Sequence, residues 1–186
     1  ERADVVMHNL PNPASTIKLG LNFETLVSIN PRIIIAEISA FGQTGPLAGV
    51  KGYDLILQAF SGLMDLNGPP TDNHPWRFVS PIVDEVTALA GYTGILEALF
   101  KRERSAQVFP QQLDIALVNS MALILASSIS ASATFDREIT RQGDAYASIH
   151  PYQVYQAKDE LFVLAIGSEA NWKKFCQVIE RVDLVT

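Results

Sequence analysis

Two short runs rich in β-branched residues, at 3–9 (ADVVMHN) and 31–41 (PRIIIAEISAF), constrain the fold of this chain more than any other feature. Between them lies an amphipathic stretch whose apolar residues are Leu19, Leu21, Phe23, Leu26 and Val27. A strand, a helix and a second strand in this order form a parallel pair within one sheet. The chain is therefore predicted to contain an α/β domain with a parallel, Rossmann-like sheet.

Further elements follow the second run. An apolar helix is expected at 53–66 (YDLILQAFSGLMDL), and a proline-marked connection leads from it to another helix that contains Asp84. The run 112–119 (QLDIALVN) alternates apolar and polar residues as a strand does, and it continues into a helix of small residues.

Polar and turn-forming residues cluster at 136–150, which predicts a linker. Residues 1–135 then form part of a large α/β domain, and residues 151–186, with the pattern of strand, turn and helix, begin a smaller α+β domain. Because sheets average about five to six strands and this sequence starts directly in a strand, we expect it to be an excerpt of a longer protein.

Composition excludes several classes of protein. The formal charge of −6, without a Lys and Arg cluster, argues against nucleic-acid binding. No apolar run approaches the roughly 18 residues of a membrane span, and the first residues do not resemble a signal peptide, so a cytoplasmic protein is expected. Cys176 is the single cysteine, so the chain forms no internal disulfide, and a reduced, half-buried thiol is expected there.

The sequence does not match the common local motifs for a phosphate-binding loop, a metal site or a serine nucleophile. GQTGP and GVKG match neither GxGxxG nor GxxxxGK[ST], so no phosphate-binding loop is predicted. His8, His74 and His150 are scattered without HExxH or CxxC nearby, and no metal site is predicted. A GxSxG nucleophile elbow is also missing from the sequence.

Asp84 lies in the first turn of the helix predicted within 79–94 (VSPIVDEVTALAGYTG). The apolar residues expected on the buried face of this helix are Val83, Val86, Leu89 and Ala90. The acid could cap the helix by accepting backbone N–H bonds, which contributes about 1 kcal/mol. Alternatively, those amides keep the carboxylate ionised as a nucleophile, with Ala88, Ala90, Gly91 and Gly94 leaving space for a ligand or a close helix. The local sequence does not choose between the two.

Several motifs in fixed order carry a resemblance across nearly the whole chain. They are ADVVMHNL, LGLNFETLVSINPRIIIAEISAFGQTGP, KGYDLILQAFSGLM, GPP, the Asp84 segment with GILEALFKR, and QQLDIALVNS. This series resembles family III CoA-transferases, the CaiB/BaiF family, which includes formyl-CoA transferase and, as a divergent branch, 2-methylacyl-CoA racemase.

The resemblance implies that Asp84 is the catalytic residue of an acyl-CoA:carboxylate CoA-transferase that works through an aspartyl-CoA thioester. It implies a coenzyme A thioester as substrate, a carboxylic acid as acceptor and no tightly bound cofactor. Residues 1–135 would belong to the CoA-binding domain, and the full-length protein would be an interlocked homodimer.

Two segments correspond to CoA-binding parts of the family. The ENF-like segment maps onto His8, Asn9 and Leu10 with Pro11 next, and the basic residue before the LG pair maps onto Lys18. The stretch NLPNPASTIKLG is about one residue longer than usual in the family, which makes Lys18 a softer match than Asn9.

The family's loop beside the active site maps onto Lys51, Gly52, Tyr53 and Asp54. Without the resemblance, Lys51 would be a solvated loop lysine and Tyr53 a core residue. The racemase branch has a histidine where this chain has Tyr53, and histidine abstracts an α-proton near neutral pH where tyrosine usually does not. Racemase activity is therefore the alternative, and a non-catalytic CoA-binding protein or inactive fragment is a third.

The family's glycine-rich active-site loop has a counterpart at 141–155 (RQGDAYASIHPYQVY), which contains no run of glycines. This difference predicts that substrate choice departs from that of formyl-CoA transferase.

Overall fold

The computed structural model describes residues 2–10, 12–105, 107, 109–136 and 138–185. The chain divides into two compact units, of which the first comprises Glu1–Met64 and Arg77–Ile139 and the second Asp65–Trp76 and Thr140–Thr186. Residues 65–76 thus group with the later part of the chain, whereas the sequence places them within 1–135. The three-part division at 135 and 150 stays a prediction.

The first unit is built on a parallel sheet, which confirms the predicted α/β class. Its described strands have the order β1-β2-β3, with His8 paired to Glu37 and Glu37 to Asp114. The bounds are β1 (Val5–His8), β2 (Ile34–Ser39) and β3 (Gln111–Ala116). Ile34 and Ile35, in the central strand, are fully buried, as the β-branched run predicts.

Two short helices connect β1 to β2, namely α1 (Pro13–Leu19) and α2 (Phe23–Ile29). Asn12 caps α1, because its side-chain oxygen accepts a hydrogen bond of 2.9 Å from the amide of Ser15. Gly20 ends α1 with a φ of 67°, a left-handed conformation that glycine adopts without strain. These caps explain why the predicted amphipathic stretch forms two helices.

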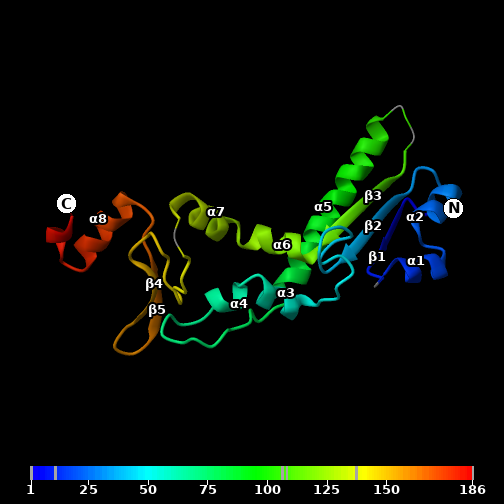
Figure 1. The fold of residues 1–186 in the computed structure, drawn as a ribbon. Helices are drawn as coiled ribbons and strands as arrows, with labels where there is room; N and C mark the ends of the chain where they lie inside the picture. Colours follow the sequence, from blue (N-terminus) through cyan, green and yellow to red (C-terminus); the bar gives the residue numbers. More distant parts are fainter. Residues whose placement is uncertain (1, 11, 106, 108, 137, 186) are drawn as a thin grey trace. The chain divides into compact units, whose positions relative to one another are not determined.

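The long helix α5 (Ile82–Arg104) runs along the sheet beside β3 (Figure 1). A Cβ added to Gly91 would lie 3.2 Å from Ile115 Cδ1, and one added to Gly94 would lie 3.6 Å from Leu113 Cδ1. The small residues therefore let a strand approach, and the expectation that both glycines face a ligand or a helix was wrong. Leu89, expected to be buried, is 65% exposed.

At the carboxyl end of the sheet, two shorter helices, α3 (Asp54–Phe60) and α6 (Leu117–Ile124), contact α5 and each other. Two further helices follow them in the chain, α4 (Leu63–Leu66) after α3 and α7 (Ala126–Phe135) after α6. The predicted helix at 53–66 is interrupted at Gly62, whose φ is 80°. The predicted strand at 112–119 ends at Ala116, because Leu117 already begins α6.

This end of the first unit has its own apolar core, formed by Ala40, Leu57, Val83, Leu117 and Met121. Within the described residues, no single helix is long and apolar enough to cross a bilayer; α6 and α7 reach that length and composition only as a pair, with a bend of 66° between them.

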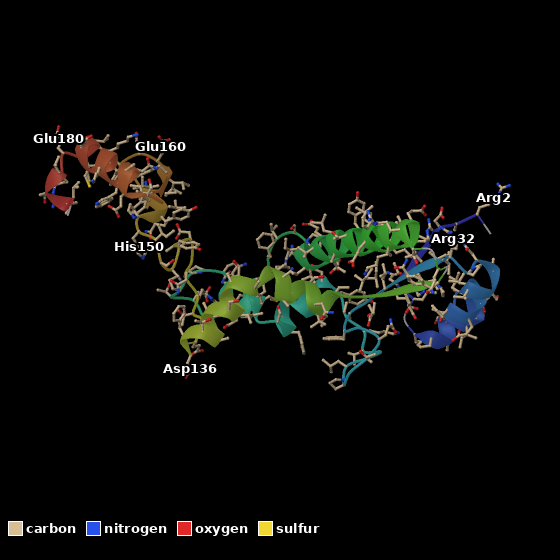
Figure 2. The ribbon with its side chains drawn as sticks, turned by 90° about the horizontal axis from the view of Figure 1, so that it is seen from above. Arg2, Arg32, Asp136, His150, Glu160 and Glu180 are labelled. Carbon is tan, nitrogen blue, oxygen red and sulfur yellow. The ribbon has the colours of Figure 1, made fainter. Side chains whose placement is uncertain are left out.

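The opposite end of α5 is tied to the turn before β2. Arg32, labelled in Figure 2, places its guanidinium 3.4 Å from the carboxylate of Glu103, and its carbonyl accepts a hydrogen bond from Arg102. Arg102 also forms an ion pair of 3.0 Å with Asp4. These contacts fix α5 along the sheet at the end remote from Asp84.

The second unit contains an antiparallel pair of strands followed by a helix. The sequence predicts the second strand and the helix, but it does not predict the first strand. Its described elements are β4 (Tyr152–Gln156), β5 (Leu161–Ala165), α8 (Glu169–Val178) and the 3₁₀ helix η1 (Val182–Leu184). Arg141 holds the 65–76 segment to this unit by donating to the carbonyls of Asp65, Asp72 and His74.

Candidate active site

A cavity of about 1200 Å³ opens in the first unit at the carboxyl ends of β1 and β2. This edge of a parallel sheet is where α/β proteins usually bind their ligands. Among the residues that line the cavity are six that the sequence predicts for the site: Asn9, Leu10, Lys51, Gly52, Tyr53 and Asp84. The fold therefore brings together segments that are as much as 75 residues apart in the chain.

The other predicted residues have different positions. Lys18 is exposed on α1 and is not part of the cavity lining, although Thr16 and Ile17 are. Asp54 is also outside the lining, because its carboxylate points to the start of α5. Pro11 lies outside the described residues.

Asp84 is the third residue of α5 and is exposed at the cavity. Partial desolvation raises the pKa of its carboxyl above the usual 3.8, and the negative charge of Asp54 raises this pKa further. The helix amides do not stabilise the ionised carboxylate of Asp84, contrary to expectation, because the amides of Val83 and Asp84 donate to Asp54 instead. Among the described residues, none donates a hydrogen bond to the carboxylate of Asp84, so its oxygens are available to a ligand.

The first turn of α5 is capped by a residue from another helix. Asp54, the first residue of α3, accepts hydrogen bonds through Oδ2 from the amides of Val83 at 2.8 Å and Asp84 at 3.3 Å. The amides of Ile82 and Glu85 donate to the carbonyls of Ser80 and Pro81. The helix end thus needs no cap from Asp84, which removes the capping explanation for this acid.

Gln58 supports Asp54 and was missed by the sequence reasoning. Its side chain is fully buried, its Nε2 donates to Asp54 Oδ1, and its Oε1 accepts from the amide of Phe78 at 2.8 Å. A signal was available, because residues four apart on a helix lie on the same face and an Asp–Gln pair can form a hydrogen bond there.

The loop before α3 presents Lys51 and Tyr53 to the cavity. Tyr53 is 79% exposed, so the alternative that it packs in the core was wrong. Gly52 lies close to neighbouring side chains, since an added Cβ would be 2.8 Å from Leu57 Cδ2 and 3.0 Å from Ala40 Cβ. This close approach, rather than a special backbone angle, explains the glycine between the two exposed side chains.

A polar group that the sequence reasoning did not connect lies on another part of the cavity wall. His8 Nε2 is 3.4 Å from Glu37 Oε1, and Gln112 Nε2 donates to Glu37 Oε2 at 2.7 Å. The acid within the apolar run PRIIIAEISAF was the available signal, because a carboxylate in a buried strand needs polar partners. Among the described residues, no group of three His, Cys, Asp or Glu is placed to hold a metal ion.

Comparisons with known proteins agree with the resemblance seen in the sequence. A family model described as CoA-transferase family III matches residues 1–186. Succinate–glutarate CoA-transferase of Agrobacterium fabrum is 33% identical over 95% of this chain and 43% of its own length. Acetyl-CoA:oxalate CoA-transferase of Acetobacter aceti is 34% identical over 100% of this chain and 47% of its own length.

A solved structure shows the same fold. The crystal structure of a CaiB/BaiF family protein from Brucella suis matches with a TM-score of 0.82 and 33% identity, covering 98% of this chain and 47% of that protein. The chain therefore spans about half the length of the relatives that it matches.

Proposed function

We propose that this chain, which belongs to CoA-transferase family III, carries the nucleophile of an acyl-CoA:carboxylate CoA-transferase, and that the nucleophile is Asp84. The observation that carries the proposal is that Asp84 lines a large cavity while Asp54 satisfies the helix amides that would otherwise use it. A carboxylate with a raised pKa is also a better nucleophile than an ordinary aspartate once it is ionised.

The proposed reaction has balanced steps. The carboxylate of Asp84 attacks the thioester carbonyl of the donor, which gives a mixed anhydride and CoA thiolate. The thiolate attacks the aspartyl carbonyl, forms an aspartyl-CoA thioester and releases the donor acid. The acceptor carboxylate then attacks this thioester to give a second anhydride, and the thiolate attacks the acceptor's acyl carbon, which yields the new acyl-CoA and frees Asp84.

The cavity residues suggest how the substrate is held. Lys51 supplies a positive charge for a CoA phosphate or a substrate carboxylate in a protein whose formal charge is −6. Asn9 and Leu10, from the segment after β1, and Tyr53 contribute polar and apolar contacts. Since the relatives described above are named for succinate, glutarate and oxalate, small dicarboxylic acids are the first acceptors to test.

The direct test uses Asp84→Asn in the full-length protein. We expect CoA transfer to fall by at least about a thousandfold, because no other group in the scheme forms the covalent intermediate. Mass spectrometry after incubation with acyl-CoA and hydroxylamine should show a modification on Asp84. The matched control is Glu85→Gln, which changes an acid in the same turn that does not line the cavity and should keep full activity.

Three results would contradict the proposal in different ways. Full activity in Asp84→Asn would exclude its role as nucleophile. Solvent deuterium at the substrate α-carbon without an acceptor acid would indicate epimerisation of a 2-methylacyl-CoA. No heat on titration with CoA would indicate a protein that does not bind it.

The proposal extends to the assembly. The full-length protein is expected to be the interlocked homodimer that the family resemblance implies, and a cytoplasmic location remains a prediction. Sedimentation of the full-length protein tests the first statement, and a monomer would contradict it.

A further inference from the structure

Gln58 has a position that the proposed chemistry does not explain. It lies on α3, is fully buried and is not part of the cavity lining. A buried amide is stable only where both its donor and its acceptor are bonded, and here both are. The two bonds lead to different parts of the chain, namely to Asp54 on the same helix and to Phe78 in the segment before α5.

We propose that Gln58 is a positioning residue for Asp84, acting through Asp54 and the backbone at Phe78. The predicted change in kcat rests on the proposed function, whereas the predicted changes in hydrogen exchange do not. The Nε2 group of Gln58 is a donor, so it fixes Oδ1 of Asp54 and leaves Oδ2 directed at the amides of Val83 and Asp84. Its Oε1 holds the segment 77–81, through which the chain enters α5.

The donors and acceptors in these hydrogen bonds explain why position 54 is an aspartate and position 58 a glutamine. The amides of Phe78, Val83 and Asp84 are all donors, so each needs an acceptor. Asp54 supplies only acceptors when ionised, and Gln58 supplies one donor to Asp54 and one acceptor to Phe78. A shift of either side chain would move the backbone of Asp84, and misplacement of a nucleophile by about 1 Å can cost about a hundredfold in rate.

The first experiment compares Gln58→Met with Gln111→Met. Both remove a glutamine amide that donates to another group, but Gln111 donates to the carbonyl of Ala98, away from the cavity. In Gln58→Met, hydrogen exchange at the amides of Phe78 and Val83 should rise about tenfold more than at Ile35, which reports global opening from the central strand. We also expect kcat to fall about tenfold while KM stays within about twofold. Gln111→Met should show neither change.

A second experiment exchanges the carboxylate and the amide between positions 54 and 58. It tests the same positioning role and does not depend on the folding of Gln58→Met. Asp54→Asn alone places an amide donor against the amide donor of Gln58, so exchange at Val83 should increase and kcat should fall. In the double variant Asp54→Asn with Gln58→Glu, the amide at position 54 donates to the carboxylate at position 58, which also accepts from Phe78. We expect the double variant to regain at least half of the exchange protection and of kcat lost in Asp54→Asn.

Two results would overturn the inference. In Gln58→Met, hydrogen exchange that rises no more at the Val83 amide than at the Ile35 amide would show that Gln58 has a purely structural role. A double variant whose exchange protection and kcat are no higher than those of Asp54→Asn would show the same. If the wild-type protein transfers no CoA, the proposed function fails, and the exchange measurements still decide whether Gln58 positions the start of α5.

Discussion

At the scale of single residues, the exposure and the pKa of Asp84 depend on the hydrogen bonds and the charge of its neighbour Asp54. Asp54 caps the helix end, so the carboxylate of Asp84 is left facing the cavity with a raised pKa. Ionisation of Asp84 therefore works against the folded state, which is the opposite of what a helix cap does. Such a cost in stability agrees with the proposed role of Asp84 as nucleophile, because catalytic groups often lower the stability of the fold that holds them.

This difference gives a prediction about pH. An acid whose pKa is raised on folding stabilises the protein below its unfolded pKa, and that stabilisation is lost as the pH rises through the folded pKa. Asp84→Asn removes the ionisation, so at neutral pH its Tm should equal or exceed that of the wild type. Calorimetry across the acidic range should show the two Tm values converging as the pH falls, and a lower Tm for the variant at neutral pH would restore the capping explanation.

The raised pKa of Asp84 should also affect the rate of CoA transfer. In the proposed reaction only the ionised carboxylate attacks the thioester, so transfer activity should decline on acidification at a pH above the usual 3.8 of an aspartate. The pH dependence of kcat/KM measures this limb. A limb at or below the ordinary aspartate value would contradict the raised pKa.

The sequence predicted the cavity-lining residues better than it predicted their supports. Asp84, Lys51 and Tyr53 lie in motifs whose order carries the family resemblance, and all three line the cavity. The cap from Asp54 joins residues 29 positions apart, and the pairing of His8 with Glu37 joins two strands. Such contacts depend on how elements pack, which local spacing does not reveal.

At the scale of elements, α5 shows which features of a helix the spacing of apolar residues predicts and which it does not. The strands β1 and β2 were predicted from runs of β-branched residues, β3 from alternation, and the helix from the spacing of its apolar residues. Which face of the helix is buried was predicted only in part, because Val83 is buried and Leu89 is not. The buried face is decided by β3, whose side chains meet the helix at Gly91 and Gly94.

The two glycines should therefore respond differently to alanine. Gly94→Ala adds a methyl group at an ordinary contact distance of 3.6 Å from Leu113 and should stabilise the protein by about 0.5–1 kcal/mol through helix propensity. Gly91→Ala adds one at 3.2 Å from Ile115, so crowding should cancel part or all of that gain. Urea unfolding compares them, and equal stabilisation would show that β3 does not limit the space.

At the scale of the whole molecule, each of the two units has its own stabilising contacts. The second unit gathers residues 65–76 through Arg141, whose side chain is largely buried and donates to three backbone carbonyls. The turn-rich composition of 136–150 suggested a linker but could not reveal this attachment, since the partners of Arg141 are 67 to 76 residues away.

Arg141→Met should loosen the second unit. The loss of charge-assisted hydrogen bonds should cost about 1.5–3 kcal/mol and increase hydrogen exchange within 65–76, with little change at β2. The control is Arg181→Met, which removes an exposed ion pair with Asp183 and should cost no more than about 1 kcal/mol. Equal effects of the two substitutions, or a matching change at β2, would contradict this role.

The saturated first turn of α5 also limits where negative charge can be neutralised. The amides of Ile82, Val83, Asp84 and Glu85 all have acceptors inside the protein, so this helix end has no spare N–H group for a diphosphate or for the oxygen of a tetrahedral intermediate. In the proposed reaction those charges are met by side chains such as Lys51 or by amides of other segments, and a search for the oxyanion hole can begin away from the helix that bears Asp84.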